Sequence, residues 1–470
     1  MNQKYKSLLS NTLVFAIGSF GSKLITFLLV PLYTNILTTA EYGTADLVTT
    51  CSNIFVPIFS LVVQDSVLRF GIDRSKDSNV VVKNALIVLA IGSVVFTLLT
   101  PFIGFYNAIS EWKWYLLSIT ISTMFSNVLL CYVKALGRNK LYSIISIVNA
   151  LVLAITNFIL LAVIHTGVRG YLLANIIAQM VNVAIIGFAT KIYRNIFNAK
   201  FDASLMREML KYCIPLILNN LSWWVLNSSD RIMVESFCSA EGLGLYSAAS
   251  KIPALLSIIT SIFSQAWTLS AVQEYDNDKE KSFYSNIFEI YSLIMFIGGS
   301  IVIFIAKDFM KVYVGKEFYQ AWTYVPLLVF GAVYFAFSAF FGAIYSASKK
   351  NIGVACTTGI AAVINVAINV LLLPRIGVIG AAVSTAVSYF SIAIIRMIHS
   401  RKYFSFKMNY MKYCVCSIIL LLQTSFVTFN WNTYLVSLLT IFSLVVVNRN
   451  TIRKVIKMLR CSIQTTNTNK

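Results

Sequence analysis

The chain has 470 residues, of which 58% are hydrophobic and 12% are charged, and its formal net charge is +20. A soluble domain carries about 25% charged residues, so this composition excludes an ordinary soluble fold. The basic residues are dispersed between apolar segments and form no basic domain, which argues against a nucleic-acid-binding protein.

Apolar stretches follow one another along the whole chain, and each is long enough to cross a bilayer as a helix of about 20 residues. The connections between them leave no room for a folded soluble domain. We therefore predict an all-α polytopic membrane protein with about fourteen transmembrane helices, at approximately 8–34, 42–64, 81–106, 113–133, 141–165, 170–190, 211–236, 243–270, 283–306, 321–347, 351–373, 378–398, 412–429 and 432–448.

The basic residues indicate the orientation of these helices. If the N-terminus and every second connection lie on one side of the membrane, that side receives most of the 38 Lys and Arg residues. Arg396, near the end of stretch 378–398, is counted on this side. Basic connections stay in the cytoplasm, so both termini are predicted to be cytoplasmic. The opposite side receives Lys113, Arg169, Lys307, Lys311, Lys316 and Arg375.

Short motifs recur in register and predict two lobes of six helices. Glu41-Tyr42-Gly43 opens the second helix, and Glu241-Gly242-Leu243-Gly244 opens the eighth. Because six is even, the lobes would be parallel repeats related by an axis along the membrane normal, enclosing a central cavity. The predicted parts are an N-terminal lobe (1–197), a cytoplasmic linker (198–210), a C-terminal lobe (211–400), a terminal helix pair (401–448) and a basic tail (449–470).

Three cations fall inside the apolar stretches: Lys23, Arg231 and Lys251. A charge in hydrocarbon costs at least about 2.5–3.5 kcal/mol, so it needs a partner, water or a ligand. Polar stripes at helical spacing mark the helices that face the predicted cavity. One stripe comprises Asp46, Thr50, Asn53, Pro57, Ser60 and Gln64, and another comprises Asn220, Trp224, Asn227 and Arg231.

Two interpretations of these groups remain open. Surplus buried cations suit an anionic ligand, and the indole of Trp224 beside them could stack on a sugar face. Alternatively, Asp46 and Asp230 neutralise the cations and hold the helices together. Arg69 and Lys134 either steer an anionic headgroup at the cytoplasmic mouth or only set the topology. Glu289 either exchanges protons or forms a salt bridge to a neighbouring helix.

Several segments resemble the Wzx-type O-antigen and capsule flippases of the multidrug/oligosaccharidyl-lipid/polysaccharide exporter superfamily. They include Thr38-Thr39-Ala40-Glu41-Tyr42-Gly43, Asn227-Ser228-Ser229-Asp230-Arg231 and Gly244-Leu245-Tyr246-Ser247 followed by Lys251. The resemblance implies a two-lobed bundle in the bacterial inner membrane. It would move undecaprenyl-diphosphate-linked oligosaccharide from the cytoplasmic to the periplasmic leaflet by alternating access, with cavity cations at Lys23, Arg231 and Lys251.

This resemblance implies a transporter without cofactor or metal rather than an enzyme. Its expected partners are the lipid-linked oligosaccharide, the bilayer, and a polysaccharide polymerase with its chain-length regulator. One alternative is a cation-coupled multidrug exporter on the same scaffold, which should have acids dominating the cavity. Another is a membrane-embedded polymerase or glycosyltransferase, which would need a large periplasmic loop, whereas the loop at 307–320 is short and contains only Asp308 and Glu317 as acids.

Overall fold

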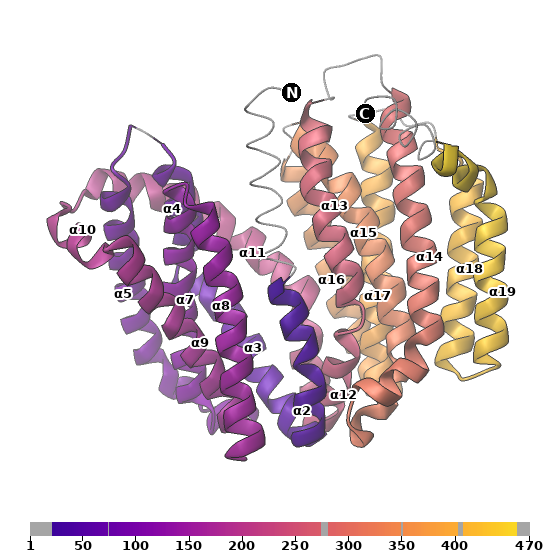
Figure 1. Cartoon of the computed structure of the whole chain (residues 1–470), viewed down its shortest axis with the longest axis horizontal. Helices are drawn as coiled ribbons and strands as arrows, with labels where there is room; N and C mark the ends of the chain where they lie inside the picture. Colours follow the sequence, from indigo (N-terminus) through magenta and orange to yellow (C-terminus); the bar gives the residue numbers. More distant parts are fainter. Residues whose placement is uncertain (1–20, 74, 274–280, 349–350, 403–407, 458–470) are drawn as a thin grey trace, which may run out of the picture. The chain divides into compact units, whose positions relative to one another are not determined.

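The computed structural model describes residues 21–73, 75–273, 281–348, 351–402 and 408–457, and every regular element in these ranges is a helix (Figure 1). The described chain forms two compact units, Met1–Ser247 and Ala248–Lys470. The lobe boundaries expected from the sequence stay predictions. Within unit 1, α11 packs against α3, α4 and α5.

Unit 1 contains the first helices of the chain in sequence order. They are α2 (Val30–Ile36), α3 (Thr39–Phe59), α4 (Val63–Gly71), α5 (Ser78–Ile103), α6 (Asn107–Ser110), α7 (Lys113–Ala135), α8 (Asn139–Asn157), the π-helix η1 (Phe158–Val163), α9 (Gly167–Thr190), α10 (Ile192–Asn198), α11 (Ala203–Phe237) and the start of α12 (Ala240–Ser250).

Unit 2 begins at the end of α12. Its helices are α13 (Ala254–Gln273), α14 (Lys281–Tyr313), the 3-10 helix η3 (Lys316–Thr323), α15 (Val325–Ala347), α16 (Asn351–Ile376), α17 (Val378–His399), the 3-10 helix η4 (Ser400–Lys402), α18 (Tyr410–Thr428) and α19 (Thr433–Val447). In this unit α18 and α19 lie side by side, and both contact α14 (Figure 1).

The predicted all-α membrane fold is confirmed, whereas the number of fourteen spans is not. Among the described residues, nine helices are long and apolar enough to cross a membrane, or up to twelve if each of three bent pairs is one span. Of the remaining predicted spans, 8–34 lies partly outside the described residues. The other, 211–236, belongs to α11, where the asparagine, serine and tryptophan residues between Tyr212 and Ser229 lower the mean hydropathy.

The second predicted helix is broken rather than continuous. α3 and α4 meet at an angle of 56°, and Leu61 and Val62 at the break have positive φ values of 50° and 56°. The hydroxyl of Ser60 accepts a hydrogen bond from the backbone N–H of Val62, which satisfies a donor freed by the break. The polar stripe expected along 46–64 therefore changes direction at Ser60.

Each unit has its own apolar core. In unit 1, α7 packs against α4, α5 and α9, and the cluster includes Val67, Leu89 and Met209 from three different helices. In unit 2, aromatic rings stack between α13 and α15, with the Trp267 and Phe340 centroids 4.4 Å apart. Close packing in these interiors restricts the rotamers of the polar side chains that lie within them.

Candidate functional site

The starts of α3 and α12 cross in backbone contact within unit 1. A Cβ atom added to Gly43 would lie closer than 3.0 Å to the Ala240 carbonyl oxygen, and one added to Gly244 would meet the Thr39 carbonyl oxygen equally closely. Only glycine fits at such a crossing. The two glycines belong to the motifs that the sequence analysis matched between the lobes.

The contact is reciprocal. Thr39 and Gly43 of α3 correspond to Ala240 and Gly244 of α12 at a common offset of 201 residues, the separation that also relates Asp46 and Ser247. Gly43 faces Ala240 and Gly244 faces Thr39, as expected for an interface with local two-fold symmetry. The structure therefore brings two repeated segments against each other, and we call this crossing the glycine seam.

Asp46 lies one turn further along α3 and connects three helices. Its Oδ2 atom is 2.7 Å from Nε of Arg231 in α11 and accepts a 2.7 Å hydrogen bond from the hydroxyl of Ser247 in α12. The exposed fractions of the side chains are 8% for Asp46 and 18% for Arg231. Because both groups are largely removed from solvent, the ion pair compensates charges that would be costly alone.

Neighbouring polar groups extend this network. The buried carboxylate of Asp230 accepts a 2.8 Å hydrogen bond from the Tyr246 hydroxyl. The indole N–H of Trp224 donates to the backbone carbonyl of Thr50 at 3.1 Å, and Arg231 Nη1 donates to the Asn227 carbonyl at 3.2 Å. Together these contacts join α3, α11 and α12 through side chains from both predicted polar stripes.

A further acid of α11 is engaged outside the seam. Glu235 accepts a hydrogen bond from the hydroxyl of Tyr106, which lies in the connection between α5 and α6. Burial, followed by this hydrogen bond, raises the pKa of Tyr106 to about 12. The phenol therefore stays protonated as a donor at neutral pH.

The other predicted residues of unit 1 are placed less centrally. Lys23, Asn53 and Arg69 are exposed, and the Lys134 ammonium lies 4.2 Å from the centroid of the Tyr142 ring. The side-chain amides of Asn220 and Asn227 donate to carbonyl oxygens one turn earlier in their own helix, with Asn220 half-buried and Asn227 exposed. Lys251 belongs to unit 2 and is half-buried.

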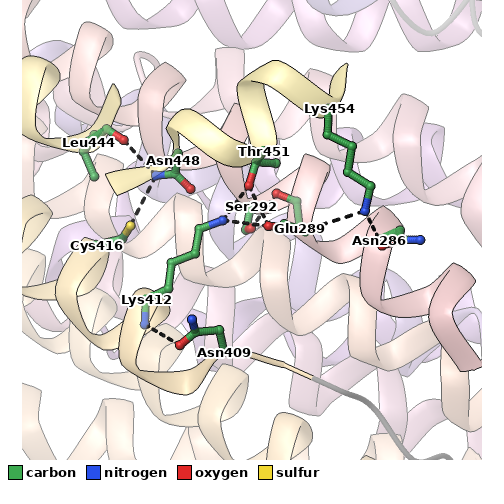
Figure 2. Close-up of polar contacts among 10 residues, drawn as sticks. All are labelled: Asn286, Glu289, Ser292, Asn409, Lys412, Cys416, Leu444, Asn448, Thr451 and Lys454. Carbon is green, nitrogen blue, oxygen red and sulfur yellow. Dashed lines mark hydrogen bonds and ion pairs between the residues drawn. The ribbon is translucent and has the colours of Figure 1, made fainter. Parts of the chain in front are cut away.

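Glu289 forms a separate cluster in unit 2 (Figure 2). Its Oε1 atom is 2.9 Å from Nζ of Lys412 and accepts a 2.6 Å hydrogen bond from the Thr451 hydroxyl. Its Oε2 atom is 3.9 Å from Nζ of Lys454, which also donates to Asn286. Of the two roles expected for Glu289, this geometry favours the salt bridge, which ties α14 to α18 and to the helical turns after α19.

Arg396, which the sequence analysis counted with the cytoplasmic-side cations, lies in the last turn of α17 and is 1% exposed inside unit 2. Its guanidinium donates to the hydroxyls of Thr357 and Thr358 at 3.0 and 2.9 Å, and to the Ser338 and Val354 carbonyls at 3.0 and 3.4 Å. The sequence signal for a buried partner was the pair of adjacent threonines in an apolar stretch, because polar groups in hydrocarbon need hydrogen-bond partners.

Comparisons with known proteins address the family directly. The profile of the polysaccharide biosynthesis protein family matches residues 8–268, more than half of the chain. The chain belongs to this family. A second profile, MatE, matches residues 215–371. These matches agree with the resemblance inferred from the sequence motifs.

A curated relative and solved structures extend the comparison. A protein of the Haemophilus influenzae Lsg locus is 24% identical over 263 residues, and the match spans 54% of this chain and 64% of that relative. The lipid II flippase MurJ in an inward closed conformation has a TM-score of 0.66 at 13% identity, covering 94% of this chain and all of the other.

Members of the related transporter group share the same fold. An inward-facing multidrug resistance MATE family transporter of the MOP superfamily has a TM-score of 0.60 at 16% identity, covering 81% and 97% of the two chains. A Pyrococcus furiosus MOP superfamily transporter has a TM-score of 0.62 at 15% identity, covering 84% and 95%. At these identities the likeness shows the fold of this chain.

Proposed function

We propose that this polysaccharide biosynthesis protein is a flippase for lipid-linked anionic oligosaccharide. Its cargo would be undecaprenyl-diphosphate carrying an O-antigen or capsule repeat unit, moved from the cytoplasmic to the periplasmic leaflet by alternating access. The observation that carries this proposal is the family match over residues 8–268. The fold shared with a lipid II flippase supports it, because that protein is named for moving a lipid-linked cargo.

The membrane location follows from the charge pattern. Basic residues gather on the side that contains the N-terminus and the basic end of the chain. The positive-inside rule supports the proposal that both termini are cytoplasmic, and we propose the bacterial inner membrane as the location. A polysaccharide polymerase and its chain-length regulator would be the partners that use the delivered repeat units.

The cargo would bind through cations that can exchange partners. Lys23, Arg231 and Lys251 would hold the diphosphate, and the ion pair with Asp46 would keep Arg231 compensated when no cargo is present. A diphosphate offers more oxygens than one carboxylate, and arginine binds such groups in a bidentate manner. Asp46 and Asp230 would then balance charge within the protein rather than bind cargo.

The sugar part of the cargo would meet amide and aromatic groups. Asn53, Asn220 and Asn227 offer side-chain amides, and Trp224 offers an indole ring face while its N–H stays bonded to α3. Arg69 and Lys134 would attract the anionic headgroup at the cytoplasmic mouth. Glu289 would balance the charge of Lys412 in unit 2.

A cation-coupled multidrug exporter is the second candidate, favoured by the MatE profile match over residues 215–371. An exporter of cationic drugs needs an acidic cavity. In this chain the seam acid Asp46 is already paired with Arg231. An enclosed cation beside the acid disfavours a second cation as ligand.

Liposomes reconstituted with the purified chain can separate the two candidates. Fluorescent undecaprenyl-diphosphate oligosaccharide should become accessible to an external quencher, whereas ethidium should not be transported. Arg231→Ala should slow flipping at least about tenfold, because a hydrogen bond to a charged group contributes about 1.5–3 kcal/mol. Arg375→Ala, an exposed cation of α16, is the matched control. Ethidium transport without flipping would overturn the proposal.

A further inference from the structure

A groove on the surface of unit 1 lies along the first turns of α11, away from the glycine seam. Its volume is about 520 Å³, and it is open to the surroundings. The residues that line it come from α11 and the segment just before it. They are Phe201, Ala203, Met206, Arg207, Leu210, Lys211, Ile214 and Pro215.

The two faces of α11 explain why the groove is lined as it is. Leu205, Met209 and Cys213 are buried against unit 1, which fixes the opposite face outward. On that outward face Ile214 is 59% exposed, and Phe201, just before the helix, is 53% exposed. The helix therefore presents apolar side chains where a soluble helix would be polar.

Two cations lie among these apolar groups. Arg207 and Lys211 are both exposed and are separated by one helical turn on the same face. Neighbouring acids are engaged elsewhere: Glu208 pairs with Lys76, and the Asp202 carboxylate accepts a hydrogen bond from the backbone N–H of Leu205 as the helix cap. The groove thus has a net positive charge beside an apolar floor.

The apolar floor and the two cations together indicate which class of ligand fits the groove. A free polyanion would gain nothing from the apolar floor, and an apolar chain alone would gain nothing from the cations. An amphiphile with an anionic phosphate group satisfies both, with the phosphate between the cations and a hydrocarbon chain on the floor. We propose that this groove binds an anionic phospholipid of the surrounding membrane.

Native mass spectrometry of the purified protein can test this proposal. In titrations with phosphatidylglycerol, the double variant Arg207→Ala/Lys211→Ala should weaken one lipid site about 25-fold, from about fivefold for each cation. Binding of neutral phosphatidylcholine should not change. The swapped variant Arg207→Lys/Lys211→Arg should retain the site, because both charges remain.

A matched control separates this groove from general basic attraction. Arg449 and Arg453 are exposed cations with the same one-turn spacing on another helix, and Arg449→Ala/Arg453→Ala should leave this lipid site intact. Equal losses in the two double variants, or no loss in the first, would overturn the proposal. It would also be overturned if the first variant lost undecaprenyl diphosphate but kept phosphatidylglycerol.

Discussion

Unit 1 and unit 2 each enclose an arginine, and they hold it in different ways. Arg231 of unit 1 pairs with the carboxylate of Asp46 and keeps 18% of its side chain exposed. Arg396 of unit 2 is 1% exposed and donates to hydroxyls and backbone carbonyls from α15 and α16. One arrangement supplies a countercharge, whereas the other supplies neutral oxygen atoms.

The two arginines differ in whether their partners could be replaced by another group. In the proposed flippase, an anion of the cargo would replace the carboxylate beside Arg231 without a change in the backbone. The oxygens around Arg396 belong to helices that pack against each other, so they cannot be replaced without loosening α15, α16 and α17. We therefore expect Arg396 to act on stability and Arg231 on both stability and transport.

Arg396→Ala should give the largest loss of stability. It removes four hydrogen bonds from a guanidinium with no access to solvent and leaves their acceptors buried. We expect the free energy of unfolding to fall by about 4 kcal/mol, measured by SDS titration in mixed micelles. Lys402→Ala, at an exposed neighbouring position, should change it by less than about 0.5 kcal/mol. Equal effects would mean that the buried contacts contribute little.

Arg231→Ala should cost less, about 3 kcal/mol, because partial exposure lets water relieve the uncompensated Asp46. Adding Asp46→Asn should restore much of this loss, since the second change removes the charge left behind. The double-mutant cycle measures the coupling between the two side chains. Additive losses would show that the ion pair does not connect α3 and α11.

Gly43→Ala should lower the free energy of unfolding by about 2 kcal/mol, because the methyl group would collide with the α12 backbone. Gly187→Ala is the control, since a Cβ at that helical glycine meets nothing within 4 Å. The control should be neutral or stabilising by up to about 1 kcal/mol. If both substitutions stabilise the protein, the two helices are not in contact.

The smallest effects should come from the Glu289 cluster. Lys412→Ala should cost about 1 kcal/mol, because Nζ lies 2.9 Å from the carboxylate and its side chain is 13% exposed. Lys454→Ala should cost less than about 0.5 kcal/mol, because Nζ is 3.9 Å away and 39% of the side chain is exposed. The reverse order would mean that Lys454 anchors the terminal helices.

The sequence predicted the helices well, because hydrophobic length alone identifies a membrane span. It also pointed to the matched glycine motifs, since two repeats leave a visible offset. The partners of the buried charges could not be predicted, because Asp46 reaches Arg231 only through the packing of α3 against α11. The burial of Arg396 was missed for the same reason: a cation near a helix end looks like a topology signal until the neighbouring threonines are placed around it.

The glycine seam also limits how α3 and α12 can move against each other. Helices separated by bulky side chains can slide, because rotamers readjust along the interface. Where backbone meets backbone at a single crossing, a shift along either axis would drive a larger residue into the contact. Tilting about the crossing point requires no such collision, so the seam restricts sliding of α3 along α12 more than it restricts tilting.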